Sequence, residues 1–412
     1  MKFTIYAGLA GLLALPTVLA QVASVANDGV SAAVTIPDTY IVKFKSNPDA
    51  TKKKKYTDKI NSKKGGKKGV VESISVNGFD AAVVEIPPSE LKTLLESDLV
   101  EYVEKDVVAN ITGVATPIEK RAYVNQLDAV WGLARISHNP TWPATRGQSN
   151  YYYDNSAGNG VRVYIIDTGI RTTHTEFASN RAVWGKNFIT GSPNTDEHGH
   201  GTHVAGTVAG TKYGVAKRAT VVAVKVLDKN GSGTMAGVVQ GITWAITDAK
   251  NKNIAKKTVF NLSLGGGYSA AVNAAIKAAT DAGITVVVAA GNDNIDAKNS
   301  SPASAPTAIT VGAIEGTRTR AWWSNFGPLV DIFAPGVSIL SSHHLSNTDT
   351  YYMDGTSMAS PHVAGLAAYF IAKEGLSGYA AVTNRIISAS IKNAVRDPKG
   401  GLNNLAYNAG GK

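Results

Sequence analysis

Three residues whose types could carry out nucleophilic catalysis stand in separate segments of the chain. Asp167 directly follows an apolar run, His200 opens the sequence His-Gly-Thr-His, and Ser357 lies in Gly-Thr-Ser-Met. A serine hydroxyl attacks a carbonyl carbon efficiently only when a neighbouring base accepts its proton, and an imidazole, which titrates near neutral pH, suits that role. A carboxylate can hold the imidazole in one tautomer and stabilise its charged form. Each segment alone also fits a turn or a helix start, but together, in the order Asp, His, Ser, they favour catalysis by a serine nucleophile.

The histidines allow a second interpretation, because three of them lie close together in the sequence. His198, His200 and His203, with Asp196, could ligate a metal ion and make the chain a metallohydrolase. The spacing argues against this, since the chain has no His-Glu-x-x-His helix. A third interpretation is a non-catalytic binding protein built on the same fold.

Strands and helices are predicted to alternate in the segment that holds these residues. Near-continuous apolar runs, typical of strands buried on both faces, cover Val161–Ile166, Thr220–Leu227, Thr258–Leu264 and Ile284–Ala290. Helical spacing of apolar residues covers Met235–Ala249 and Ala270–Ala282. This alternation predicts an α/β fold with a doubly wound parallel sheet and helices on both faces. Catalytic groups should then lie near the carboxyl ends of the strands.

The first 121 residues are predicted to form two segments separate from this sheet. Residues 1–20 have the pattern of a secretory signal peptide. Residues 21–121 show the order strand, helix, strand, strand, helix, strand, which predicts a small α+β domain of ferredoxin-like type. Lys120-Arg121 is a dibasic pair, so we expect cleavage between Arg121 and Ala122. The remaining residues, 122–412, would be the working domain.

The composition excludes several kinds of site and partner. Among 412 residues there is no cysteine, which excludes disulfides, thiolate–zinc sites and cysteine nucleophiles. No uninterrupted apolar run is long enough to span a membrane. The net charge is +10 and lysines crowd residues 52–68, but only Tyr56 could stack on a base there, so we expect no nucleic-acid partner. We expect a monomer.

The three catalytic motifs resemble those of the subtilisin superfamily, most closely the proteinase K-like secreted serine proteases of fungi. The resemblance runs from about Trp131 to the C-terminus, and residues 36–108 resemble the family's inhibitory prodomain. Segments such as Tyr151–Ile170 resemble proteases of nematode-trapping fungi, which implies degradation of host cuticle or other extracellular proteins. The resemblance therefore implies a secreted serine endopeptidase, made as a zymogen and inhibited by its own propeptide, with proteins and peptides as substrates.

The resemblance also assigns roles to residues of this chain. It makes Asp167, His200 and Ser357 the catalytic triad and the amide of Asn292 the oxyanion donor. The substrate main chain would pair with two strand edges, and a pocket without an acidic residue would take apolar or aromatic side chains. The implied substrate-binding residues are Gly231, Ser232, Gly233, Met235, Ser263, Leu264, Gly265, Ala289 and Gly291. Met235 replaces the aromatic residue that close relatives usually have, which leaves the preference of that outer subsite open.

A structural calcium ion is a further implication of the resemblance. The family site uses backbone carbonyls near Pro306 and Ala308 and a carboxylate that corresponds to Asp331. Oxygen ligands of these kinds suit a hard cation. The alternative is that Asp331 merely caps a turn.

Four sequons for N-linked glycosylation occur in the chain. They begin at Asn110, Asn230, Asn261 and Asn299. Asn261 falls in a predicted buried strand and Asn230 beside the substrate cleft, so we expect Asn299 to carry the glycan in the mature chain.

Overall fold

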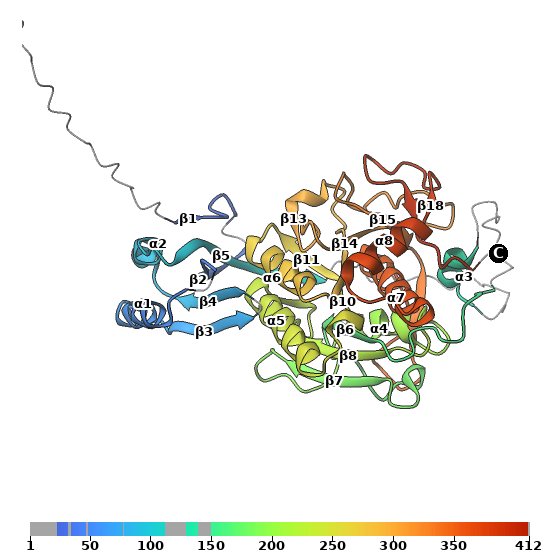
Figure 1. The fold of residues 1–412 in the computed structure, drawn as a ribbon, viewed down its shortest axis with the longest axis horizontal. Coiled ribbons are helices and arrows are strands. Elements are labelled where there is room, and N and C mark those ends of the chain that lie inside the picture. The colour runs from blue at the N-terminus through green and yellow to red at the C-terminus, as the bar shows by residue number, and fades with distance from the viewer. Residues whose placement is uncertain are drawn as a thin grey trace, which may run out of the picture.

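The computed structural model describes residues 23–31, 34–46, 48–76, 78–111, 129–138 and 150–410. The predicted signal peptide, 1–20, and the expected cleavage site at Arg121 and Ala122 lie outside the described residues. The chain forms a smaller N-terminal part, which ends at Ile111, and a larger part that holds all three catalytic motifs (Figure 1).

The N-terminal part is a four-stranded antiparallel sheet with two helices on one face. Its order is β5-β2-β4-β3, and the short strand β1 also pairs with β5. This order, with a helix after the first and third of the four strands, confirms the ferredoxin-like prediction. The elements are β1 (Ser24–Val25), β2 (Thr35–Phe44), α1 (Ala50–Ser62), β3 (Gly69–Val76), β4 (Phe79–Glu85), η2 (Pro88–Glu90), α2 (Leu91–Leu95) and β5 (Val100–Ile111).

Alternation along these strands decides what each face of the small sheet covers. Val42 and Phe44 of β2 pack with α1 and α2, whereas Ile41 faces the other way. That second face joins the hydrophobic cluster of helices α5 (Met235–Asn251) and α6 (Ala270–Asp281). The small sheet is therefore docked on two helices of the larger part (Figure 1).

The larger part is built on a nine-stranded sheet of order β18-β19-β15-β14-β12-β10-β6-β8-β7. All neighbouring pairs are parallel except β18 with β19, which confirms the predicted parallel sheet. Its strands are β6 (Arg162–Asp167), β7 (Ala182–Asn187), β8 (Thr220–Lys225), β10 (Thr258–Leu262), β12 (Thr285–Ala289), β14 (Ile309–Ile314), β15 (Ile332–Pro335), β18 (Ile391–Lys392) and β19 (Asn404–Leu405).

The remaining strands and helices surround this sheet and complete the described chain. The remaining strands are β9 (Ser232–Thr234), β11 (Leu264–Gly267), β13 (Ser300–Ser301), β16 (Ile339–Ser342) and β17 (Thr350–Met353). The remaining helices are α3 (Trp131–Ser137), η3 (Thr175–Phe177), α4 (His200–Ala209), η4 (Ala255–Lys257), η5 (Ala297–Asn299), α7 (Thr356–Glu374) and α8 (Tyr379–Ala389). No helix in the described ranges has the length and apolar character that crossing a membrane requires.

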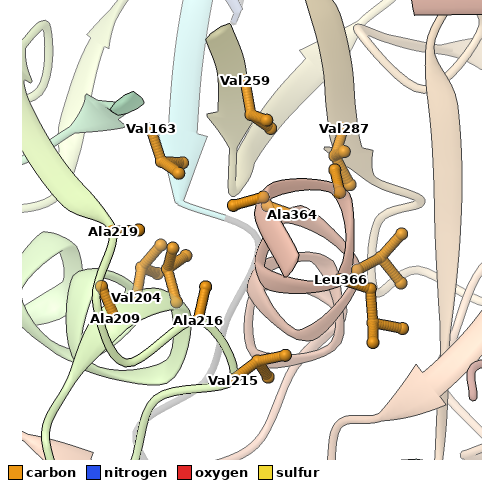
Figure 2. Close-up of a cluster of buried hydrophobic side chains, with 14 of the residues drawn as sticks. Val163, Val204, Ala209, Val215, Ala216, Ala219, Val259, Val287, Ala364 and Leu366 are labelled. Carbon is orange, nitrogen blue, oxygen red and sulfur yellow. The ribbon is translucent and has the colours of Figure 1, made fainter. Parts of the chain in front are cut away.

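Both faces of the large sheet are covered by helices. Val163, Val259 and Val287, from three neighbouring strands, point toward Ala364 of α7, and α4 completes that layer (Figure 2). The alternate residues, such as Tyr164, belong to the cluster with α5 and α6 on the opposite face. The helices that start at the two catalytic motifs, α4 and α7, thus lie together on one face of the sheet.

Candidate active site

Asp167 and His200 form a buried hydrogen-bonded pair at the carboxyl end of β6. Asp167 is the last residue of β6, and His200 is the first residue of α4. His200 Nδ1 lies 2.8 Å from Asp167 Oδ1, and the two side chains are 1% and 0% exposed. Because a carboxylate oxygen accepts, Nδ1 carries the hydrogen and Nε2 is the acceptor nitrogen. Nε2 has no hydrogen-bond partner among the described residues, so it can take a proton from a reacting group.

The helix that begins at His200 approaches this aspartate very closely. A Cβ atom on Gly201 would lie 2.2 Å from the carbonyl oxygen of Gly169 and 3.1 Å from Asp167 Oδ1. Only glycine permits that approach, which explains why glycine follows the histidine.

Asp196 organises the start of α4 and does not bind a metal with the histidines. Its Oδ1 accepts hydrogen bonds from Thr168 Oγ and two backbone N–H groups, and its Oδ2 accepts from the N–H and hydroxyl of Thr202. Burial alone would raise the pKa of Asp196, but these hydrogen bonds bring it below its usual range. In the part of the chain that is described, no three His, Asp or Glu side chains are grouped to hold a metal ion. The metallohydrolase interpretation is therefore wrong for these residues.

His203 is a packed histidine on the inner face of α4. Its Nε2 donates toward the carbonyl oxygens of Ile339 and Tyr351, both at 3.0 Å. Burial lowers the pKa of His203 to about 3, so the ring is neutral. It shares no chemistry with His200.

Ser357 is the second residue of α7 and is fully buried. Its hydroxyl donates to the carbonyl oxygen of Ser263 (2.9 Å), while the Ser263 hydroxyl donates to the carbonyl oxygen of Ser357 (2.8 Å). These two bonds tie the helix start to the segment between β10 and β11. For His200 Nε2 to accept the proton of Ser357, that hydroxyl would have to donate to the imidazole instead of to Ser263.

Asn292 follows β12, and its amide is oriented by Thr356. The N–H and hydroxyl of Thr356 both donate to Asn292 Oδ1, at 3.0 and 2.9 Å. The Thr356 hydroxyl in turn accepts from the N–H of Gly291 (3.0 Å). With Oδ1 held, the amide nitrogen is the end that remains to donate. Sequence reasoning missed Thr356, although its position directly before the nucleophile was a usable signal.

The two strand edges expected to bind substrate hold the end of the N-terminal part. Ala109 of β5 pairs with Gly233 of β9, and on the other side Asn110 and Ile111 pair with Gly265 and Leu264 of β11, all antiparallel. Residues 108–111 are therefore the middle strand between the two edges, β9 and β11. Peptide recognition by strand addition has this form.

Apolar side chains surround the place where β5 pairs with these two edges. Ala109 and Met235 are fully buried and belong to one cluster with Leu264. A Cβ atom on Gly266 would lie 2.8 Å from the methyl carbon of Met235, so the thioether fills the space that this glycine leaves. Of the two residues expected to line the specificity pocket, Ala289 ends β12 and Gly291 lies two residues further on, directly before Asn292.

Two carboxylates of β5 cap helices of the larger part. Glu104 accepts from Ser269 Oγ (2.6 Å) and from the N–H of Ala271 (3.3 Å) at the start of α6. Asp106 accepts from the N–H of Ala236 (3.1 Å) at the start of α5. Burial raises the pKa of Glu104 and raises that of Asp106 to about 7. For both residues the sequence pattern predicts only that they lie in a strand.

Lys225 is a buried cation near Asp167. It ends β8, is 0% exposed, and donates to the carbonyl oxygens of Thr168 (2.7 Å) and Leu227 (2.9 Å). Its Nζ lies 3.7 Å from Glu197 Oε2. Burial lowers the pKa of Lys225, whereas nearby carboxylates, including that of Asp167, raise it. A lysine within an otherwise apolar strand was the signal for this group in the sequence.

Asp331 is a largely buried carboxylate next to the expected calcium-binding carbonyls. Its Oδ2 accepts from the N–H of Thr310 (2.9 Å), two residues after Ala308. Burial raises the pKa of Asp331 to about 6, and no basic side chain of the described ranges forms an ion pair with it. A buried carboxylate without a cationic side chain fits a bound cation.

The sequons differ in their accessibility. Asn261 is fully buried and bridges Ser263 Oγ (2.9 Å) and Ser360 Oγ (2.8 Å), so it is structural. Asn230 and Asn299 are exposed, the latter at the end of η5. Asn299 thus remains a candidate for glycosylation.

Comparisons with known proteins agree with this arrangement. Residues 158–410 match the subtilase family, and residues 39–112 match the peptidase inhibitor I9 family. A subtilisin-like protease 2 from Pseudogymnoascus destructans is 46% identical over 380 residues, which cover 91% of this chain and 90% of that protein. A cuticle-degrading protease from Metarhizium anisopliae is 42% identical over 405 residues, covering 96% of this chain and 98% of that protein.

A solved structure supports the same assignment. The crystal structure of a cold adapted subtilisin-like serine proteinase has 40% sequence identity and a TM-score of 0.63, and the match covers 68% of this chain and 99% of that one. The family match, the similar proteins and the solved structure therefore support the same family assignment. The chain belongs to the subtilase family and is a serine endopeptidase that carries an I9 inhibitor prodomain.

Proposed function

We propose that this chain is the zymogen of a secreted, extracellular and monomeric endopeptidase whose triad is Asp167, His200 and Ser357. The observation that carries the proposal is the buried 2.8 Å contact between Asp167 and His200, which leaves His200 Nε2 as a base. Hydrolysis of this kind requires a nucleophile, a base and an orienting carboxylate, and the chain supplies candidates for all three from segments far apart in the sequence.

Each step of peptide-bond hydrolysis can be assigned to a residue of this chain. Ser357 Oγ attacks the carbonyl carbon of the substrate while His200 takes its proton, and Asp167 stabilises the imidazolium. The amide nitrogen of Asn292 donates to the oxyanion, since Thr356 already holds the other end of that side chain. His200 passes the proton to the leaving amine, and water then hydrolyses the acyl ester by the same route in reverse.

Substrate preference follows from the lining of the cleft. Ala289, Gly291 and Leu264 offer no charge to select lysine or arginine, so apolar and aromatic side chains are favoured on the acyl side of the cut. Several relatives bear the name cuticle-degrading protease. We extend that to this chain as degradation of host cuticle or other extracellular proteins, which the signal-like residues 1–20 also favour.

Calcium would stabilise the mature enzyme. The carboxylate of Asp331 and the carbonyl oxygens of Pro306 and Ala308 would bind the ion. Its positive charge would stabilise the ionised form of Asp331, which burial otherwise disfavours. The stabilisation matters because the chain has no disulfides.

The direct test is covalent labelling of the nucleophile. A fluorophosphonate should label the mature enzyme once per chain and abolish its hydrolysis of casein. Ser357→Ala should show neither labelling nor hydrolysis, whereas Ser360→Ala, three residues further along α7, should keep the label. Full hydrolysis by Ser357→Ala would refute the proposal.

A further inference from the structure

Asn325 is a fully buried residue whose side chain bonds to the loop that follows β12 and carries Asn292. Its amide nitrogen donates to the carbonyl oxygen of Ala290 (2.8 Å). Its Oδ1 accepts from the backbone N–H groups of Asp293 (3.0 Å) and Ile295 (3.1 Å). One side chain therefore bonds to this loop on both sides of Asn292.

The side-chain amide of Asn325 can make these three bonds in one orientation only. A carbonyl oxygen accepts and a backbone N–H donates, so the amide nitrogen must face Ala290 and the amide oxygen must face the two N–H groups. The backbone N–H of Asn325 adds a fourth bond, to the carbonyl oxygen of Gly291 (2.9 Å). Four hydrogen bonds from a single residue thus hold the backbone of residues 290–295.

Gly291 lies against Asn325 so closely that only glycine fits. Its φ is +102°, and a Cβ atom there would lie 2.3 Å from Asn325 Nδ2. The N–H of Gly291 donates to the Thr356 hydroxyl (3.0 Å), while its carbonyl oxygen accepts from Asn325. The residue directly before Asn292 is therefore held between the start of α7 and Asn325.

The segment that leads to Asn325 is itself fixed to the rest of the domain. Arg320, which is 3% exposed, donates through Nη1 to the carbonyl oxygen of Ser324 (2.5 Å) and through Nε to that of Asp397 (3.1 Å). The hydroxyl of Ser324 accepts from the N–H of Ala313 on β14 (3.1 Å). Asn325 is thus anchored to the large sheet and can support the neighbouring loop.

We propose that Asn325 is a positioning residue that places the amide of Asn292 where it donates to the oxyanion. Thr356 orients the side chain of Asn292, whereas Asn325 holds the backbone on either side of it. An oxyanion donor must lie about 2.7–3.1 Å from the oxyanion, and a displacement of about 1 Å can lower the rate about 10²-fold. This role rests on the proposed function, because it requires Asn292 to be the oxyanion donor.

The test is a double-mutant cycle of Asn325→Ala and Asn292→Leu in the mature enzyme. The kcat is measured per active site labelled by a fluorophosphonate, so unfolded chains do not lower it. Asn325→Ala alone should lower kcat about 10- to 100-fold and change KM less than about twofold. In the Asn292→Leu background the same substitution should lower kcat less than about twofold, because the donor that it displaces is already absent.

A second variant covers the case in which Asn325→Ala does not fold. Asn325→Asp keeps an oxygen that accepts from the two N–H groups but loses the donor to Ala290. Its loss of kcat should likewise disappear in the Asn292→Leu background.

The matched control is Asn408→Ala, which alters another fully buried asparagine. The Asn408 amide donates to the carbonyl oxygen of Tyr152 (2.5 Å) and accepts from the N–H of Gly410 (2.9 Å). This variant should lower the melting temperature, as Asn325→Ala does, but it should leave kcat within about twofold of wild type.

The outcomes separate the role of Asn325 from the proposed function. Equal losses of kcat in both backgrounds, or an unchanged kcat in Asn325→Ala alone, would overturn this role, while labelling of Ser357 left the proposed function intact. An unchanged kcat in Asn292→Leu alone would refute Asn292 as the oxyanion donor, and the role of Asn325 with it. Absence of labelling in the wild-type enzyme would refute the proposed function itself.

Discussion

Thr356 holds the side chain of Asn292 through two hydrogen bonds, from its N–H (3.0 Å) and from its hydroxyl (2.9 Å), both to Asn292 Oδ1. The residue before the nucleophile thereby sets the orientation of the amide that would face the developing oxyanion. Nucleophile and oxyanion donor are fixed to the same helix start, and a displacement of α7 would move both together.

Asn292→Leu should lower kcat by about 10²–10³ with little change in KM, the magnitude typical of the loss of one oxyanion donor. Thr356→Val removes only the orienting hydroxyl and should lower kcat by about tenfold. Steady-state kinetics on one peptide substrate measure both. Thr356→Ser keeps the hydroxyl and should stay near wild type; equal losses for Thr356→Ser and Thr356→Val would contradict the orienting role.

Lys225→Met should lower both activity and stability. The variant keeps the apolar stem but leaves the buried carbonyl oxygens of Thr168 and Leu227 without their donor, at about 1–3 kcal/mol for each. It also removes a positive charge near Asp167, so His200 should keep its proton to higher pH and the acidic limb of kcat/KM should move upward. Melting curves and pH–rate profiles measure the two effects.

The matched control for this variant is Lys186→Met, which alters an exposed lysine on the neighbouring strand β7. It should leave the melting temperature and the pH profile unchanged. If Lys225→Met lowered stability but left the acidic limb in place, the role of Lys225 would be structural alone.

The cleaved prodomain should leave the enzyme faster as the pH rises from about 4 to 7. Burial raises the pKa of Asp106 to about 7 in the docked state, above the ordinary value near 3.8. Between these two pH values Asp106 carries a proton in the docked state but not in the released state. The free energy of docking therefore becomes less favourable as the pH rises, until Asp106 is ionised in both states. Glu104 on the same strand shifts in the same direction. One pKa unit corresponds to a tenfold change, so we expect at least about tenfold faster release at pH 8 than at pH 5.

The release rate is measured by the appearance of activity after self-cleavage at each pH. Asp106→Asn keeps an oxygen that can accept from Ala236 but cannot ionise, so its release should vary less with pH. Release that was slower at pH 8 than at pH 5 in the wild-type chain would contradict this account.

Removal of calcium should lower the melting temperature, whereas a reductant should not. A chelator takes away the ion proposed beside Asp331, and dithiothreitol finds no disulfide in a chain without cysteine. Because the bound ion requires the ionised carboxylate and the pKa of Asp331 is about 6, the calcium effect should fade as the pH drops through 6. Asp331→Asn should abolish the calcium effect, and Asp281→Asn on the exposed end of α6 should keep it. A calcium effect that survived in Asp331→Asn would place the ion elsewhere.

The class of fold and the candidate catalytic residues could both be predicted from the amino-acid sequence. Asp167, His200 and Ser357 could be selected because each stands in a motif of fixed spacing, and the apolar runs between them predicted a parallel sheet because buried strands need no polar face. Each of these patterns spans only a few neighbouring residues, so it can be recognised in the sequence without a structure.

Tertiary structure alone decided which distant groups meet. The histidines at 198, 200 and 203 lie close together in the sequence, and all three could be candidate metal ligands. Only the packing of α4 shows that His203 donates to backbone carbonyl oxygens and that Asp196 accepts hydrogen bonds from the start of the helix. Likewise the sequence predicts a strand that ends near residue 108, but only the folded chain shows that Asn110 and Ile111 lie opposite Gly265 and Leu264. Strand register and hydrogen-bond partners depend on contacts between segments far apart in the chain. The sequence of any single segment therefore does not predict them.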